Sequence, residues 1–133
     1  MDNSPIHCVG VVCFKGDYVL MIKRGTPPRQ GEWSIPGGRI NKGESQENAA
    51  LRELYEETAV AAILGPKIAM IPAHFEGKNY MLHDFIAHWQ TGEPNAGDDA
   101  ADCAFIHIND IPKMKLWDKT CELILNAYER KKD

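Results

Sequence analysis

The chain has 133 residues, 44% hydrophobic and 26% charged, so a single domain over residues 1–133 can bury a core without disulfide staples. The formal net charge is −4 and the longest basic run is Arg130–Lys132, which argues against a nucleic acid polymer as partner. No apolar run approaches the roughly 20 residues of a membrane helix, and the first residues lack the pattern of a signal peptide. We therefore expect a cytoplasmic protein with no membrane partner.

The first part of the chain has the pattern of strands joined by short turns. His7–Phe14 is a nearly unbroken apolar run, which predicts a buried strand, and Tyr18–Arg24 predicts the returning strand of a hairpin. Residues 25–31 form a loop by composition, and residues 33–35 are a short extended piece. Pro36 then introduces Gly37-Gly38, a bend followed by two residues that are free to adopt positive φ, and such a loop lets the backbone approach a metal or a phosphate closely.

The remaining elements predict two helices and further strands. Ser45 is the expected N-cap of a helix over Gln46–Thr58. The expected strands are Ile63–Phe75, Lys78–Gln90 and Cys103–Ile108, with a polar surface loop over Thr91–Asp102. Asp118 is the expected cap of a second helix, whose apolar face holds Cys121, Ile124, Leu125 and Tyr128. Two helices with strands of mixed direction predict an α/β or α+β sandwich.

The chemistry is concentrated on the helix over Gln46–Thr58. Its core face carries Leu51, Leu54 and Thr58, whereas Glu53, Glu56 and Glu57 share the opposite side, next to Arg52. These carboxylates repel one another and lie in the half of the helix where the dipole disfavours negative charge. A helix selected only for stability would not place them there. Three carboxylates on one turn are instead a typical oxygen-rich seat for a divalent cation such as Mg²⁺.

The same region resembles a known sequence pattern. Gly38, five residues, Glu44, seven residues and then Arg52-Glu53-Leu54-Tyr55-Glu56-Glu57-Thr58-Ala59-Val60 resemble the Nudix box of the Nudix hydrolases. One defined position departs from that pattern, because Ala59 stands where the box has the glycine that closes the helix. The lead-in Trp33–Gly38 and the C-terminal helix also resemble the family, so the resemblance covers most of the chain.

The resemblance implies a Nudix α/β/α sandwich around a mixed β-sheet and hydrolysis of a nucleoside diphosphate linked to another group. It implies Mg²⁺ as cofactor, with Mn²⁺ as a substitute, held by Glu53, Glu56, Glu57 and the Gly38 carbonyl. Arg52 would orient the glutamates, and Glu44 would lie close to the metal or the substrate. Family members are often homodimers, so a homodimer is the implied assembly, although no interface is visible in the sequence.

The general base and the substrate contacts are less sharply defined. Glu53 or Glu56 could act as the base, as could a carboxylate of the late loop, where Asp98, Asp99 and Asp102 lie. Arg24 and Arg29 flank the proline loop and suit phosphate oxygens, and the Gly37 and Gly38 backbone could approach the same group. Phe75, Tyr80 and Trp89 could stack on a base, although aromatic residues on strands more often belong to the core.

Three functions remain open at this point. The chain resembles small ADP-ribose pyrophosphatases, but the proline that typifies them is not at its usual place, since Pro72 comes too early. A MutT-like nucleoside triphosphate pyrophosphohydrolase that removes damaged nucleotides is the close alternative. A Nudix-like nucleotide-binding module that no longer cuts is the alternative from another class, but it usually lacks a box glutamate, and all are present here.

Overall fold

A computed structural model describes residues 4–97 and 99–131 of the chain. The elements follow one another as β1 (Ile6–Lys15), β2 (Tyr18–Arg24), β3 (Trp33–Ser34), β4 (Gly37–Arg39), α1 (Gln46–Thr58), β5 (Ala61–Phe75), β6 (Lys78–Thr91), β7 (Ala100–His107), a 3₁₀ helix (Ile108–Lys113) and α2 (Asp118–Arg130). The expected strands and both helices are therefore present, and β4 and the 3₁₀ helix are additional.

The strands form one mixed sheet whose centre is β1. The sheet has seven strands in the order β3-β2-β1-β6-β5, while β4 pairs with β1 and β7 pairs with β2. β1 runs parallel to β6 and antiparallel to β2 and β4. β1 is hydrogen-bonded on both edges, and side chains packed above and below the sheet bury residues 8–14 on both faces, as the unbroken apolar run predicts.

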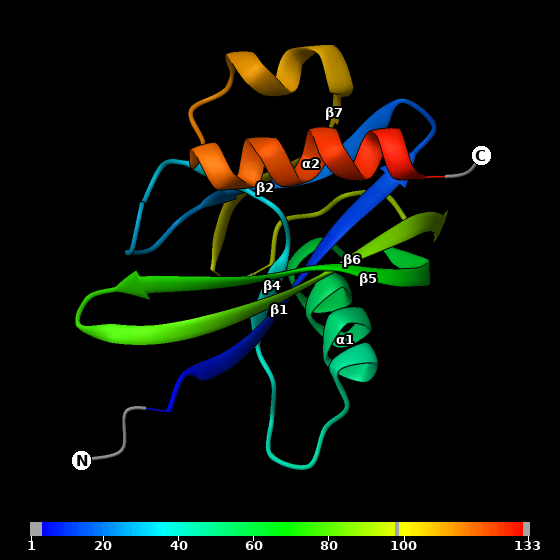
Figure 1. The fold of residues 1–133 in the computed structure, drawn as a ribbon. Coiled ribbons are helices and arrows are strands. Elements are labelled where there is room, and N and C mark those ends of the chain that lie inside the picture. The colour runs from blue at the N-terminus through cyan, green and yellow to red at the C-terminus, as the bar shows by residue number, and fades with distance from the viewer. Residues whose placement is uncertain (1–3, 98, 132–133) are drawn as a thin grey trace.

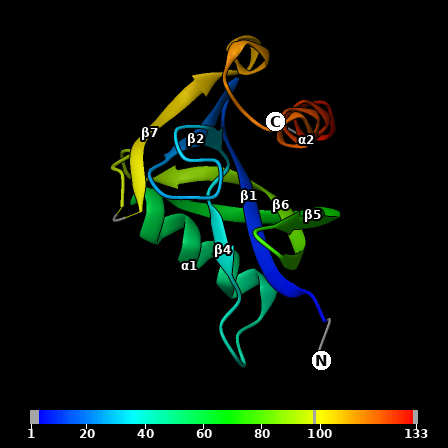
Figure 2. The same cartoon turned by 90° about the vertical axis from the view of Figure 1, so that its left-hand side faces the viewer.

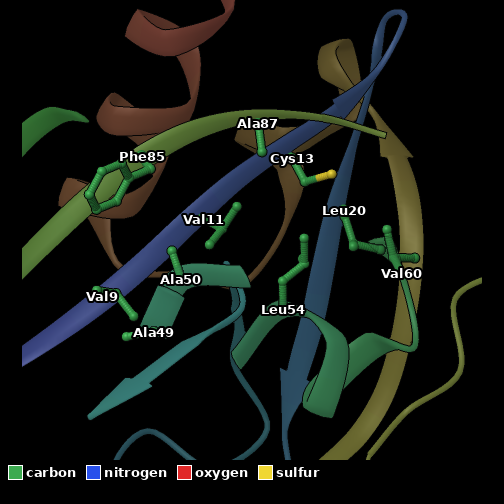
Figure 3. Packing of buried hydrophobic residues seen from close by; sticks show 10 residues of the cluster. All are labelled: Val9, Val11, Cys13, Leu20, Ala49, Ala50, Leu54, Val60, Phe85 and Ala87. Atoms are coloured by element: carbon green, nitrogen blue, oxygen red, sulfur yellow. The ribbon is translucent and has the colours of Figure 1, made fainter. Parts of the chain in front are cut away.

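Helices cover both faces of the sheet, with α1 on one side and α2 on the other (Figures 1 and 2). Alternate residues of β1 serve the two layers: Val9, Val11 and Cys13 pack with α1, whereas Val12 and Phe14 pack with α2. Figure 3 shows the first of these clusters. The expected arrangement of two helices around a mixed sheet is thus confirmed. None of the helices in the described ranges is long and apolar enough to cross a bilayer.

Helix α1 begins where the sequence predicts. The Ser45 side chain accepts a hydrogen bond from the Asn48 backbone N–H at 3.0 Å, which satisfies one of the unpaired donors of the first turn. At the other end Ala59 adopts the left-handed conformation with φ of 62°, and its N–H donates to the Tyr55 carbonyl at 2.8 Å. Alanine therefore closes the helix in the conformation for which the Nudix box has glycine.

Replacing Ala59 with glycine should raise the free energy of unfolding by about 0.5–1 kcal/mol. The left-handed conformation costs an L-residue about 1–2 kcal/mol, and the greater freedom of glycine in the unfolded chain offsets part of that gain. Urea unfolding of the two proteins measures the difference. Ala96→Gly is the matched control, because Ala96 is exposed and its φ is not positive. An Ala59→Gly protein no more stable than wild type would contradict the argument.

The expected apolar face of α2 is correct in part. Ile124 is buried and Cys121 and Tyr128 pack against the core, but Leu125 is 37% exposed, and the buried residues also include Thr120, Leu123 and Ala127. Asp118 is the first helical residue and not the cap, which is Trp117 without a side-chain hydrogen bond.

The polar loop is also shorter than expected. Its last residues, Ala100 to Asp102, belong to β7, where Asp102 pairs with Lys23 of β2. Strand pairing with β2 therefore overrides the polar composition of this stretch.

Candidate active site

Arg52 joins the acidic residues around α1 in one ion-pair network. Its Nε and Nη2 donate to the two carboxylate oxygens of Glu44 at 2.7 and 2.9 Å. Its Nη1 donates to Glu53 Oε1 at 2.8 Å and to Glu56 Oε2 at 3.2 Å. The planar guanidinium thus fixes three carboxylates at once, which a lysine could not do with the same geometry.

Glu44 faces Arg52 and lines neither of the clefts described below. Its Oε1 also accepts a hydrogen bond from the Asn41 N–H at 3.0 Å. The hydrogen bonds from Arg52 and then Asn41 hold the pKa of Glu44 at about 2. This geometry supports a role for Glu44 in positioning Arg52 and offers no support for the direct substrate contact expected from the sequence.

Gly37 and Gly38 are needed for close approach, and neither adopts the positive φ that glycine permits. Both lie in β4, where Gly37 pairs with Gly10 and Gly38 with Val9 of β1. A Cβ on Gly37 would collide with the Val9 carbonyl oxygen, and a Cβ on Gly38 would collide with the Glu53 carboxylate. The glycine pair therefore lets β4 pass tightly between β1 and the acidic side of α1.

Glu57 is the most perturbed carboxyl of α1. Its Oε1 accepts a hydrogen bond from the Gly37 N–H at 3.0 Å. Burial raises the pKa of Glu57 to about 8, and the neighbouring charge of Glu53 adds to the increase, while the Gly37 hydrogen bond and Arg24 oppose it. Two carboxyls held this close repel when both are ionised, and a cation between them would relieve that repulsion.

A polar cleft of about 640 Å³ opens beside these glutamates. Its lining residues come from β2 and the loop after it, β4, α1 and the loop before β7: Ile22, Arg24, Thr26, Gly37, Gly38, Arg39, Glu53, Glu56, Glu57, Gly97 and Asp99. We call this space the acidic cleft. It brings together the three box glutamates, both glycines and Arg24.

The loop before β7 is docked on the C-terminal end of α1. The N–H groups of Asn95 and Gly97 donate to the carbonyls of Thr58 and Glu57, each at 2.9 Å. These bonds satisfy carbonyls that a helix end leaves unpaired. The docking carries Asp99 to the acidic cleft, whereas Asp102 is exposed on β7 and bonds the Cys103 N–H. Asp98, the third loop carboxylate considered, lies outside the described residues.

An apolar cleft of about 260 Å³ adjoins the acidic cleft. The two share Ile22, Arg24, Gly37 and Gly38. Its aromatic wall is made by Phe75, Tyr80 and Trp117, with ring centroids 6.1 Å apart for Phe75–Tyr80 and 5.6 Å for Phe75–Trp117. Two of the three aromatic residues considered for base stacking therefore line one cleft, together with a tryptophan from the far end of the chain.

The third aromatic residue and the two arginines have separate positions. Trp89 lies away from both clefts, with its Nε1 donating to the Gly92 carbonyl at 2.8 Å. The Arg29 guanidinium stacks on Phe75 and Trp117, at 5.5 and 5.2 Å from the ring centroids, at the apolar cleft. Arg24 is the arginine that lines both clefts, and its Nε donates to the Pro28 carbonyl at 2.6 Å.

Within residues 4–97 and 99–131, no three His, Cys, Asp or Glu side chains converge as a ready metal-binding group. Glu53 and Glu56 each have an oxygen on Arg52. The donor set nevertheless suits a hard divalent cation, because Glu53 and Glu57 are close enough to raise the Glu57 pKa, and Gly38 leaves room beside Glu53.

Sequence reasoning did not single out Asp84 of β6 or Trp117, both of which line the apolar cleft. Asp84 is only 3% exposed. The available signal was an acidic residue within the apolar run of a predicted strand. Trp117 gave no signal, since its proximity to Phe75 depends on the packing of segments far apart in the chain.

Comparison with known proteins agrees with the resemblance to the Nudix box found in the sequence. The NUDIX domain profile matches residues 5–123. The ADP-ribose pyrophosphatase of Methanocaldococcus jannaschii is 32% identical over 133 residues, covering 97% of this chain and 76% of that protein. The oxidized purine nucleoside triphosphate hydrolase of Danio rerio is 35% identical over 120 residues, covering 88% and 75%. The solved NUDIX domain of Shewanella oneidensis NrtR, complexed with ADP ribose, is 25% identical with a TM-score of 0.84, covering 96% and 88%.

The chain therefore belongs to the Nudix hydrolase family. Its fold is the α+β Nudix fold, and its reaction class is hydrolysis of pyrophosphate bonds, as the sequence resemblance implied. The alternative of a binding module without activity is thereby set aside. Of the two similar enzymes described above, one is named for ADP-ribose and the other for oxidised purine nucleoside triphosphates.

Proposed function

We propose that this protein hydrolyses the pyrophosphate bond of a purine nucleotide whose base enters the apolar cleft and whose phosphates lie at the acidic cleft. The observation that carries this proposal is the continuity of the two clefts through Ile22, Arg24, Gly37 and Gly38. An apolar space next to a polar one suits a molecule with an aromatic base at one end and a charged group at the other.

The proposed cofactor is Mg²⁺, with Mn²⁺ as a substitute, held by Glu53, Glu56, Glu57 and the Gly38 carbonyl. When bound, a divalent cation neutralises phosphate charge and lowers the pKa of a water ligand. Arg52 keeps Glu53 and Glu56 in place through its ion pairs. Arg24, at the junction of the clefts, is suited to hold phosphate oxygens, and Arg29 to close the side of the apolar cleft.

ADP-ribose is the first candidate substrate, because the similar pyrophosphatase named for it covers 97% of this chain. An oxidised purine nucleoside triphosphate is the second candidate. The observation that favours the second is the carboxyl of Asp84 in the apolar cleft, since purines differ in the hydrogen-bonding groups of their edges. Both candidates place a pyrophosphate bond next to a purine nucleoside.

The test is a panel of ADP-ribose, NADH, dinucleoside polyphosphates, and ordinary and oxidised nucleoside triphosphates, incubated with the protein and Mg²⁺. The proposal expects one compound to be hydrolysed well above the others, in a reaction that EDTA abolishes. Hydrolysis that persists in EDTA would contradict the metal proposal. A lack of turnover on the whole panel would contradict the proposed substrate class.

Replacing Asp99 with asparagine should reduce kcat by about 100-fold if this loop carboxylate is the general base, as we propose, since general base catalysis contributes about 10²–10⁴-fold. Asp99 lines the acidic cleft, and the substitution removes its charge at nearly constant size. Steady-state kinetics measure the effect. Asp102→Asn is the matched control, because Asp102 is exposed on β7 outside the cleft, and its kcat should not change. Unaltered turnover of Asp99→Asn would assign the base to Glu53 or Glu56.

A further inference from the structure

The reaction proposed above gives no catalytic role to Asp84, a buried acidic residue of β6. Asp84, on the α2-facing side of β6, is 3% exposed and lines the apolar cleft. Its carboxylate makes no hydrogen bond or ion pair with any residue in the described ranges. Because buried carboxylates ordinarily have partners, a group that lines a ligand-sized space without one is expected to bind a ligand.

The neighbouring strand leaves space for this carboxylate. Gly10 of β1 lies beside Asp84 in the parallel register of β1 and β6. A Cβ on Gly10 would collide with Asp84 Oδ1 and would lie 2.8 Å from Ile35 Cδ1. Glycine at this position therefore keeps the floor of the cleft open where the carboxylate lies.

The cleft has the dimensions and walls for one aromatic base. Its volume of about 260 Å³ lies just below the range of about 300–1,000 Å³ for drug-sized ligands, which suits a single base. Phe75, Tyr80 and Trp117 supply aromatic surface. A ligand whose phosphates lie near Arg24 can therefore place its base among these rings and its polar edge near Asp84.

We propose that Asp84 reads the edge of the substrate base and selects a base with two neighbouring N–H donors, as in guanine and its oxidised forms. A carboxylate only accepts hydrogen bonds, so both of its oxygens match such an edge. The adenine edge offers one donor and one acceptor, and the acceptor repels a carboxylate. The inference rests on the proposed function, since it requires a nucleotide that spans both clefts, and it favours the second candidate substrate, the oxidised purine nucleoside triphosphate, over ADP-ribose.

The charge of Asp84 makes this selection dependent on pH. Desolvation by burial raises the pKa of Asp84 to about 6, so the carboxylate is ionised at pH 8 and gains a donor O–H below pH 6. The other charged or titratable groups of the cleft are Cys8 of β1, Arg24 of β2, Arg29 and Glu32 of the loop after β2, and Tyr80 of β6. Helix α2 adds only Thr120 and Leu123 among its residues there, neither of which titrates.

The other titratable groups of the cleft do not account for the change in base preference between pH 6 and pH 8. Arg24 donates to the Pro28 carbonyl, and Arg29 pairs with Glu32 at 3.2 Å. Burial raises the pKa of the Cys8 thiol, so it stays neutral at physiological pH. The protonated Asp84 offers one donor and one acceptor, which matches adenine.

The experiment compares kcat/KM for substrate pairs that differ only in the base: dGTP with dATP, and guanosine diphosphate ribose with ADP-ribose. Wild-type protein at pH 8 should favour the guanine member by roughly 10–100-fold, the usual discrimination of a two-bond contact. Asp84→Asn should reverse the preference, because an amide both donates and accepts. Asp110→Asn is the control, since Asp110 is exposed on the 3₁₀ helix.

A second measurement needs no variant. The guanine-to-adenine ratio of the wild-type protein should fall as the pH is lowered from 8 to 5.5, and the ionisation of the catalytic groups cancels in this ratio. A preference for ADP-ribose at pH 8, or the same ratio in wild type and Asp84→Asn, would overturn the inference while the proposed hydrolysis stood. If no pair is hydrolysed, the proposed function fails, and the affinities of the two proteins for GMP and AMP still decide the role of Asp84.

Discussion

Replacing Glu57 with glutamine should stabilise the metal-free protein at pH 8 and at the same time reduce turnover at least about 100-fold. The loss of activity follows if Glu57 holds the cation, because metal-ion stabilisation of the transition state is worth several kcal/mol and each 1.36 kcal/mol is tenfold in rate. The gain in stability follows from the pKa of Glu57, which burial and Glu53 raise from 4.5 to about 8.

The sign of the stability effect is set by proton binding. Between pH 4.5 and pH 8 the folded protein keeps a proton on Glu57 that the unfolded chain has lost, so the free energy of unfolding falls as the pH rises through this window. Glutamine has no proton to lose, and the variant avoids this loss. The expected gain at pH 8 is about 0.5–2 kcal/mol, typical of replacing a destabilised active-site group, and it should shrink towards pH 4.5.

Thermal unfolding in EDTA at pH 5 and pH 8, together with kcat, tests both effects. Glu47→Gln is the matched control, because Glu47 is exposed in the first turn of α1 and should affect neither turnover nor the pH dependence. Added Mg²⁺ should raise the Tm of the wild-type protein more than that of Glu57→Gln, since a ligand stabilises only the state that binds it. Equal Mg²⁺ shifts in the two proteins would contradict Glu57 as a ligand.

The sequence predicted well those helices and strands whose bounds are set by capping residues, turns and the spacing of apolar residues. The bounds of α1 were predicted to the residue, because Ser45 supplies the cap and the apolar residues recur at helical spacing. The strand over Tyr18–Arg24 was equally clear, since the turn before it ends at Asp17. On α2 two faces share one helical spacing, so the sequence predicted the face that packs on the sheet only in part.

The site was less predictable where it depends on contacts between distant segments. The box glutamates lie on one helix, and their periodicity was enough to group them. The apolar cleft joins Phe75 of β5 to Trp117 before α2, and nothing local connects these residues. Asp84 became significant because it is buried in the apolar cleft, where its neighbour Gly10 leaves it space, and that pairing follows from the parallel register of β1 and β6.

The glycine pair Gly37-Gly38 shows another limit of prediction from the sequence. A sequence says that a position lacks a side chain but not why, and glycine serves both for positive φ and for close approach. At Gly37 and Gly38 the structure shows close approach, to β1 in one case and to Glu53 in the other. Adjacent glycines therefore serve two different purposes, one in the packing of β4 on β1 and the other beside a proposed metal ligand.

Replacing Gly38 with alanine should reduce kcat/KM about 100-fold with little change in stability, whereas Gly37→Ala should unfold more easily. The three atoms nearest to the new methyl group at Gly38 all belong to the Glu53 carboxylate, the end of a flexible side chain that can move away. Moving Glu53 would also disturb its 2.8 Å contact with Arg52, and misplacing a catalytic group by 1 Å can cost about 100-fold.

The methyl group at Gly37 would instead meet backbone, the Val9 carbonyl oxygen and, at 3.0 Å, the Gly10 Cα. These atoms can yield only if the pairing of β4 with β1 shifts, so we expect a loss of about 1–3 kcal/mol in the free energy of unfolding. Urea unfolding and kcat/KM of both variants test the contrast. Full activity in Gly38→Ala would mean that Glu53 tolerates displacement, which a metal ligand held by Arg52 should not.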